Sequence, residues 1–419
     1  MSVCLVYLPH PYLGEPDAQS PLGILYIAAV LREAGVPVTV ANLTSEPEDC
    51  IDVPEAKLYG ITVTSMELLQ ANRFAARLKE MHPDCRIILG GPGSVSHEFV
   101  DWKVVDSVFL GEAEERILDV VDDWPNLQRV YYGTPVDVTK LPLPARDLIS
   151  YQGGRIFAID NEGESVCLST LRGCPYKCAF CTAPALTTEL RYRTPESVAA
   201  EVRHVKAEYG ITSFRISDDM FMVNSKRVRE MCDAIGPENV RWRCSVRTKP
   251  FKKELAALMA HAGCTEVSFG IESFDDHVLR VLKKGTTAAD NAQALEDAVD
   301  LGMTARALFM VKTPGQRPET VPINISYLER VPWTVASCTT FIPIPGSDVW
   351  AHPEEYGVRI VSRDLDEYNF YFFGPDGERP IPDVIRLKDR DPVEVDAESQ
   401  VFRDYLKETG KVNRGKAHN

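Results

Sequence analysis

A short run of cysteines constrains this chain more than any other feature. Cys174, Cys178 and Cys181 lie within eight residues in the stretch LRGCPYKCAFC, with three residues and then two between them. Thiolates bind zinc and iron–sulfur clusters. A structural zinc site takes four ligands and a redox dithiol needs only one pair, whereas this stretch holds three cysteines and no histidine. Three thiolates on a cubane leave one iron open for a substrate to chelate, so the spacing favours a cluster over zinc.

The other eight cysteines stand singly, mostly in apolar strand-like stretches, where small buried hydrophobic side chains are expected. A net charge of −15 argues against broad binding to nucleic acids or anionic membranes and is compatible with cationic substrates. The longest apolar run near the start, PLGILYIAAVL, is well short of the ~20 residues of a membrane span, and no secretory signal is visible. We therefore expect a cytoplasmic enzyme whose cysteines serve as thiols and metal ligands rather than in disulfides.

The first ~125 residues alternate between short β-rich runs and helical stretches, which predicts a parallel sheet with covered faces. The expected strands are Val3–Leu8, Val38–Leu43, Leu58–Thr64, Arg86–Leu89 and Ser107–Leu110. Ligands of such sheets bind beyond the strand carboxyl ends. Thr64–Ser65, Gly90–Pro92 and Gly111–Glu112 fall at these ends.

A second βα series follows the proline-punctuated connector Lys140–Ile149 and predicts a barrel-like sheet of six units. The fold class expected is α/β: a Rossmann- or flavodoxin-like domain over 1–140, a linker over 141–164, a partial (β/α)6 barrel over 165–346 and a short extension over 347–419. After Gly346 the periodicity weakens, apart from the aromatic run Tyr368–Phe373, and the stretch Lys407–Asn419 is expected to be frayed.

Around its cysteines the chain resembles the radical S-adenosylmethionine (SAM) superfamily. Cys174, Cys178, Phe180 and Cys181 match its C-x3-C-x2-C loop with an aromatic residue before the last cysteine. The resemblance implies a [4Fe-4S] cluster on the three cysteines, whose free iron takes the amino and carboxylate groups of SAM. It also implies a one-electron donor, such as a flavodoxin or a dedicated reductase, and release of a 5′-deoxyadenosyl radical.

The resemblance extends over 165–346 and assigns SAM contacts at the strand ends. Asp218 and Asp219 in FRISDDMF occupy the place of the amino-group motif, although one of them would equally suit a helix N-cap. Arg247 in RCSVRT is placed at the SAM carboxylate, with Arg243 as its competitor and a surface arginine as the alternative.

Two further contacts follow from the same resemblance. Glu272 and Ser273 in VSFGIES stand where ribose hydroxyls are held. Gly315 in ALFMVKTPGQ belongs to the adenine-contact turn. Lys312 stands where a glycine is more usual, which gives it either a substrate role or that of an ordinary loop lysine.

The front of the chain, about Ser2–Trp124, resembles the cobalamin-binding domain of one radical SAM branch. SPLGILYIAAVLREAG, GITVTS, LGGPGS and LGEAEE carry this resemblance, and Ser65 precedes the Gly90–Gly91 pair by 25 residues. The resemblance implies that these edges receive the corrin tail; the alternative is plain turns of a flavodoxin-like sheet. Two features make cobalamin a doubtful cofactor here: the Asp-x-His-x-x-Gly motif is absent, His10 lying in an unrelated loop, and only about 70 residues follow Gly346.

In layout and size the chain also resembles the radical SAM diol dehydratase of aminoglycoside (apramycin-type) antibiotic biosynthesis. That resemblance makes radical dehydration of a small aminosugar diol such as paromamine, a lyase reaction without corrin, the first hypothesis. Asp218, Asp219 and Glu272 are then the candidate acid–base carboxylates, with the segment around Tyr368 as a pocket wall. The alternatives are a cobalamin-dependent C-methyltransferase, other radical SAM chemistry, and an iron–sulfur scaffold without catalysis.

Overall fold

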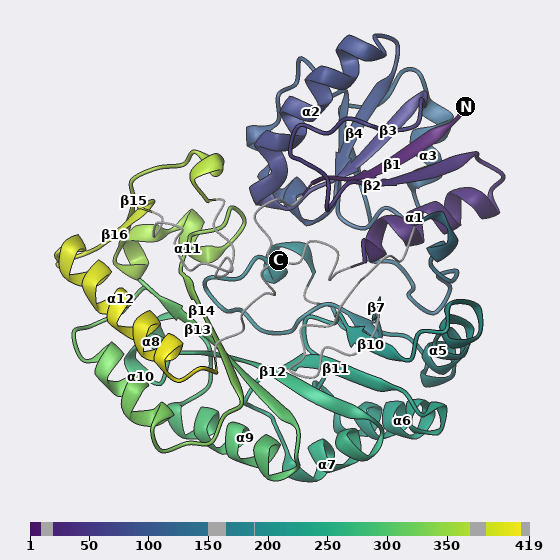
Figure 1. Cartoon of the computed structure of the whole chain (residues 1–419). Helices are drawn as coiled ribbons and strands as arrows, with labels where there is room; N and C mark the ends of the chain where they lie inside the picture. Colours follow the sequence, from purple (N-terminus) through teal and green to yellow (C-terminus); the bar gives the residue numbers. More distant parts are fainter. Residues whose placement is uncertain (10–19, 150–164, 188, 369–382, 412–419) are drawn as a thin grey trace.

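The computed structural model describes residues 1–9, 20–149, 165–187, 189–368 and 383–411, which form two parallel sheets. Figure 1 shows the N-terminal sheet set above the open side of the second, curved sheet. His10, the end of the linker, Asn369–Phe373 and the tail after Lys411 lie outside the described residues. Within the described part, no helix is both long and apolar enough to cross a bilayer.

The N-terminal sheet has six parallel strands in the order β2-β1-β3-β4-β5-β6, which confirms the predicted class. Alternate strand residues pack against α2 (Leu68–Met81) on one face and against α1 (Leu22–Glu33) and α3 (Ile117–Asp123) on the other. The strands are β1 (Val3–Tyr7), β2 (Val38–Asn42), β3 (Leu58–Thr62), β4 (Arg86–Gly90), β5 (Ser107–Leu110) and β6 (Val130–Tyr132). The short strand β6 was not predicted because three residues carry no readable periodicity.

The second sheet is the expected partial barrel, six parallel strands in the order β14-β13-β12-β11-β10-β7. Its strands are β7 (Val166–Leu168), β10 (Ser213–Ile216), β11 (Arg241–Val246), β12 (Cys264–Glu272), β13 (Thr304–Val311) and β14 (Val335–Thr340). Figure 1 shows helices along its outer side. They are α5 (Pro195–Tyr209), α6 (Ser225–Ile235), α7 (Lys253–His261), α8 (Asp276–Val281), α9 (Ala288–Asp300) and α10 (Thr320–Leu328).

The two faces of the curved sheet differ in chemistry. In β11, Trp242, Cys244 and Val246 belong to the core beneath the helices. The alternate residues, which point to the opposite face, are Arg243, Ser245 and Arg247. At β11 the inner side of the barrel is therefore lined by polar and charged side chains that the strand periodicity places there.

The cluster motif is carried by a two-stranded hairpin that the sequence did not predict. Its strands β8 (Leu171–Arg172) and β9 (Arg191–Tyr192) pair antiparallel, and the cluster loop, residues 173–190, extends from this short ladder with α4 (Ala183–Leu186) inside it. Gly173 opens the loop at φ +96°, and a Cβ there would lie 2.0 Å from the Glu189 carbonyl oxygen. Glycine is required at this point because no side chain fits.

The extension after Gly346, where the sequence periodicity weakens, contains regular elements in its described residues. The extension forms α11 (Asp348–Ala351), a hairpin of β15 (Val358–Ile360) and β16 (Ile385–Leu387), and the 17-residue helix α12 (Pro392–Glu408). Asp391 caps α12, and Phe402 packs edge-on against Phe309 with ring centroids 5.2 Å apart. The Lys411 carbonyl accepts a hydrogen bond from the Ala336 N–H, so the part of the stretch predicted to fray that the structure describes, through Lys411, is held against the barrel.

Candidate active site

The cluster loop is fixed through its backbone from two sides. The Ala179 N–H donates to the Leu282 carbonyl of the barrel at 2.9 Å, and the Ala179 carbonyl accepts from the Val349 N–H of α11 at 3.0 Å. The loop thus lies between the barrel and the C-terminal extension, and the three cysteines are held by main-chain contacts on both flanks.

The three cysteine thiols lie close enough to influence one another. Burial raises the pKa of Cys174, and raises that of Cys181 to about 11, with smaller contributions from Asp219 and the neighbouring thiols. The Ala183 N–H points at Cys181 Sγ at 3.4 Å. Within the described residues, no three His, Cys, Asp or Glu side chains lie close enough to share a single metal ion. Three soft thiols on one backbone loop with N–H donors fit the ligand set of an iron–sulfur cluster.

Arg247 reaches the cluster loop from the end of β11. Its Nη1 lies 3.1 Å from Cys178 Sγ, and its guanidinium stands 3.9 Å from the centroid of the Tyr176 ring. The side chain is 7 % exposed, and its buried Nε has no partner among the described residues. The surface-arginine alternative is therefore wrong, and Arg247 is placed to receive an anionic group beside the cluster.

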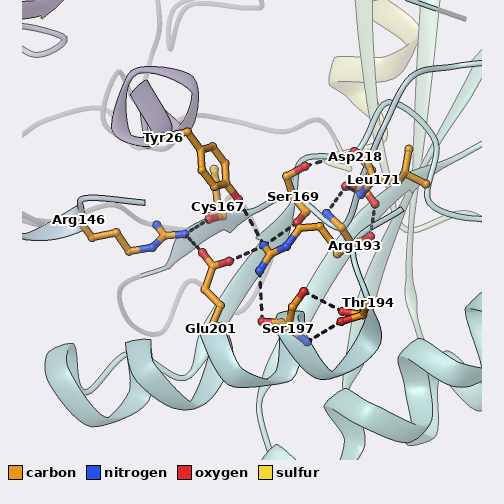
Figure 2. Close-up of polar contacts among 11 residues, drawn as sticks. Tyr26, Arg146, Cys167, Ser169, Leu171, Arg193, Thr194, Ser197, Glu201 and Asp218 are labelled. Atoms are coloured by element: carbon orange, nitrogen blue, oxygen red, sulfur yellow. Dashed lines mark hydrogen bonds and ion pairs between the residues drawn. The ribbon is translucent and has the colours of Figure 1, made fainter. Parts of the chain in front are cut away.

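The two adjacent aspartates have different surroundings. Asp218 is buried and accepts from the N–H groups of Thr170 and Leu171 at 2.7 and 3.1 Å and from the Thr170 hydroxyl (Figure 2). Arg227 lies 3.9 Å from its carboxylate. Asp219 is exposed on the wall of a cavity, where desolvation raises its pKa, and it lies within electrostatic reach of Cys174 and Cys181. Asp218 thus holds the base of the cluster hairpin, contrary to the catalytic role predicted for it, and Asp219 alone of the two faces open space.

Glu272 forms a buried ion pair that sequence reasoning missed. Lys284 Nζ lies 2.7 Å from Glu272 Oε1 and 5.6 Å from the Phe180 ring centroid. A Cβ on Gly270 would lie 2.6 Å from both paired atoms, so any larger residue there would force the ion pair to shift. Lys284 lies in the stretch LKKGTT after α8, where no spacing marks it. The pair brings a cation and an anion to the aromatic residue of the cluster loop.

The other predicted residues have defined partners. Ser273 is buried, with its hydroxyl 3.0 Å from Asn324 Oδ1, so its side chain serves the fold at this point. Gly315 has a φ of +80° in a turn against Val281. Lys312 Nζ pairs with Asp396 of α12 at 2.7 Å.

Arg243 lies deeper in the barrel than Arg247, with its Nη1 3.3 Å from Glu266 Oε1. Tyr368 is buried and donates to the Ser362 carbonyl, so it forms no pocket wall.

A cavity of about 440 Å³ is lined by both domains. From the N-terminal domain it takes the ends and one face of the sheet together with α1 and α3, and from the barrel it takes the hairpin and the end of β10. Its lining includes Ile24, Ile27, Gly60, Thr62, Ile88, Gly90, Gly91, Phe109, Gly111 and Glu112 on one side and Ser169, Arg172, Gly173, Ser217 and Asp219 on the other. An apolar slot floored by glycines and opening toward the cluster hairpin suits a flat, mostly apolar ring system such as that of a corrin.

Two of the three predicted strand-end segments reach this cavity. Gly90–Pro92 and Gly111–Glu112 line it. Ser65 is buried elsewhere, with its hydroxyl 2.8 Å from that of Ser96. The predicted edge of the sheet is therefore the cavity edge, without the serine expected at it.

Family models match both parts of the chain. The model of the radical SAM superfamily matches residues 168–325, and the model of the B12 binding domain matches residues 17–121. The second match runs against the doubt about cobalamin that the missing histidine motif and the short C-terminal part had raised.

Similar proteins span most of the chain. An uncharacterized methyltransferase of Pyrococcus horikoshii is 26% identical over 362 residues, 79% of this chain and 78% of that protein. The anaerobic magnesium-protoporphyrin IX monomethyl ester cyclase of Rubrivivax gelatinosus is 24% identical over 387 residues, covering 84% and 68%. The radical SAM methyltransferase TsrM from Kitasatospora setae, solved with cobalamin and a [4Fe-4S] cluster, superposes with a TM-score of 0.74 at 17% identity over 98% of this chain and 93% of that one.

Proposed function

Because the chain joins a radical SAM domain to an N-terminal B12-binding domain, we propose that it is a cobalamin-dependent radical SAM methyltransferase acting on a small molecule. The observation that carries this proposal is the shared cavity, which runs from the strand ends of the first domain to Asp219 beside the cluster loop. Such a cavity suits two cofactors that must meet.

The barrel residues divide the work of holding the cluster and SAM. Cys174, Cys178 and Cys181 are the cluster ligands, and a bound cluster would supply the electron that splits SAM. Arg247 is proposed to bind the SAM carboxylate, Asp219 its ammonium group, and the Glu272–Lys284 pair the ribose and neighbouring polar groups. Phe180 and Gly315 would bound the nucleoside. Apart from Lys284, which follows α8, these residues come from the cluster loop and from the carboxyl ends of β10, β11, β12 and β13, which meet beside it.

The N-terminal domain contributes an apolar slot. Gly60, Ile88 and Phe109 lie on the sheet, and Ile24 and Ile27 lie on α1 across from them. A corrin held there would carry the methyl group between SAM and the substrate. Its apolar walls would hold the flat ring chiefly by van der Waals contact, as expected for a mostly apolar cofactor site.

Radical dehydration of an aminosugar, the first hypothesis from sequence, is not retained. The relatives that match over most of the chain carry methyltransferase and cyclase names, and Asp218, one of the three proposed acid–base groups, is committed to the hairpin. A small-molecule substrate and an electron donor such as a flavodoxin or a dedicated reductase remain part of the proposal.

The test uses the full chain, reconstituted without oxygen with iron, sulfide and hydroxocobalamin. SAM labelled in its methyl group is added with a strong reductant, and the corrin fraction and 5′-deoxyadenosine are analysed by mass spectrometry. We expect the label in the corrin fraction. Formation of 5′-deoxyadenosine by a chain that retains no corrin would contradict the methyltransferase and favour corrin-free chemistry.

A further inference from the structure

The hairpin that carries the cluster loop has an unfavourable charge pattern of its own. Arg172 on β8 and Arg191 on β9 are direct cross-strand partners in a ladder of only two residue pairs. Like charges directly opposite one another destabilise a strand pair. A two-stranded ladder is marginal even without such repulsion. Something outside the hairpin must therefore compensate the two guanidinium groups.

The compensation comes from the other domain. Glu112, just after β5, accepts from Arg191 through both carboxylate oxygens, at 2.5 and 2.6 Å, and lies 3.5 Å from Arg172. Glu114 accepts from Arg172 at 2.5 Å. The four side chains are only 6 to 20 % exposed, so solvent screens these pairs weakly. Glu112 also accepts from the Val136 N–H at 2.7 Å, which fixes its carboxylate.

A third arginine ties the far end of the hairpin to the same domain. Figure 2 shows Arg193, directly after β9, donating to the Tyr26 hydroxyl of α1 at 3.3 Å and to Glu201 of α5. Glu201 also accepts from Arg146 of the connector at 2.6 Å. Tyr26 in turn lies under the guanidinium of Arg172, 5.5 Å from its ring centroid. The hairpin is thus fastened at both strands to elements of the N-terminal domain.

These contacts lie beside the cluster rather than at a remote surface. Arg172 stands two residues before Cys174, and Glu112, Glu114, Arg172 and Gly173 all line the shared cavity. A shift at the base of a two-residue ladder moves the loop that extends from it. A shift of these four side chains would therefore also change the distance between a cluster on that loop and a ligand of the first domain.

We propose that Glu112, Glu114, Arg172 and Arg191 form a latch by which the B12-binding domain positions the cluster loop. Glu112 is its central positioning residue, since it meets both arginines. The latch extends the proposed function, and only its label-transfer test rests on that function. Its structural part, order in the hairpin imposed from the other domain, stands without any cofactor.

The structural part is tested by hydrogen exchange on the full chain without cofactors. Glu112→Gln should speed exchange in peptides covering 171–192 by about 10-fold or more, because the two arginines lose their shared counter-charge. Asp106→Asn is the matched control: Asp106 pairs with Lys79 at 2.7 Å with similar burial, within the same domain but away from the cavity. Adding Arg191→Gln to Glu112→Gln should speed exchange no further. Unchanged exchange in Glu112→Gln, or additive effects in the double variant, would overturn the latch.

The positioning part is tested on protein reconstituted with cluster and hydroxocobalamin. Glu112→Gln should lower the rate of label transfer from SAM to the corrin fraction by roughly 100-fold, as expected for a displacement of about 1 Å. Iron content should stay within about 3-fold, which a merely destabilised fold would not allow, and the rates are compared at saturating hydroxocobalamin. Slow transfer caused only by lost cobalamin would overturn the positioning role. If wild type transfers no label but the exchange result holds, the proposed function fails and the latch stands as a structural device.

Discussion

The two sheets share one backbone plan and present opposite chemistry to the space between them. The first sheet turns glycines and apolar side chains toward the shared cavity, such as Gly60, Ile88 and Phe109. The second turns charged side chains inward, such as Arg243, Glu266 and Arg247. A parallel sheet sets where a ligand can bind, beyond its strand ends, but residue choice on the alternate positions sets which ligand. The contrast predicts a flat apolar cofactor on one side and a charged one on the other.

The largest effect is expected from removing a cluster ligand on the barrel side of the cavity. Cys178→Ala removes one of three cluster ligands and should reduce both bound iron and 5′-deoxyadenosine formation to background. Cys232→Ala, at a buried cysteine of α6 outside the loop, is the matched control and should retain both. Iron analysis and SAM cleavage after anaerobic reconstitution measure the outcome. Full SAM cleavage by Cys178→Ala would remove the basis of the site.

The second prediction fills part of the apolar cavity of the N-terminal domain with a larger side chain. Gly23 lines the cavity from α1, and a Cβ placed there meets nothing within 4 Å. Gly23→Ala should therefore be tolerated, whereas Gly23→Leu should weaken hydroxocobalamin binding about 10-fold or more through overpacking. SAM cleavage should persist in both, because the cluster loop is untouched. Binding is followed by equilibrium dialysis, and equal affinities in the two variants would place the corrin elsewhere.

The third prediction compares the two adjacent aspartates, one buried and one exposed, in stability and in SAM binding. Asp218→Asn should cost about 2–3 kcal/mol in the free energy of unfolding, because a buried carboxylate beside Arg227 loses its charge and one acceptor. Asp219→Asn should change stability by less than about 0.5 kcal/mol and instead raise the KM for SAM. Denaturant unfolding and SAM-cleavage kinetics separate the two. The reverse assignment would mean that Asp218 is the SAM ligand.

The smallest effect concerns pH. Burial alone would raise the pKa of Glu112, but the hydrogen bonds from Arg191 and the Val136 N–H, together with Arg172, hold its pKa below the usual value. A lowered folded-state pKa adds stability that is complete above the unfolded value of about 4.3 and is lost as pH falls through the folded value. Wild type should therefore exceed Glu112→Gln by about 1 kcal/mol near neutral pH.

That stability difference should shrink below about pH 4.3 and be constant between about pH 6 and 8. Unfolding midpoints of the two proteins across this range give the difference directly. A gap that widens on acidification would show that the Glu112 carboxylate is not stabilised in its charged form.

Much of the architecture was predictable because periodicity reports local burial. The parallel strands and the cluster cysteines follow from patterns within a few residues, as does the placement of Gly90 and Gly111 at a ligand edge. Helix α12 was missed because its caps, Asp391 and Pro392, follow a stretch without readable periodicity. The two-residue strands β8 and β9 are too short for any pattern.

The finer site depends on contacts between residues far apart in the chain. A role for Lys284 can be inferred only from its ion pair with Glu272. A role for Glu112 can be inferred only from its contact with Arg191, 79 residues away. Asp218 and Asp219 are identical in type and adjacent in sequence, so only the fold distinguishes the anchor from the exposed carboxylate. The doubt about cobalamin rested partly on the absent axial-histidine motif. That motif does not report whether the N-terminal domain forms an apolar cavity for the corrin.

The central claim is that one chain holds both cofactors, and it is tested most directly by counting them. The full chain is reconstituted anaerobically with iron, sulfide and hydroxocobalamin, freed of excess by gel filtration, and analysed for iron and cobalt in the same sample. The account predicts one [4Fe-4S] cluster and one cobalamin per chain, with SAM cleaved on reduction. An intact cluster that cleaves SAM in a chain retaining no cobalt would contradict it.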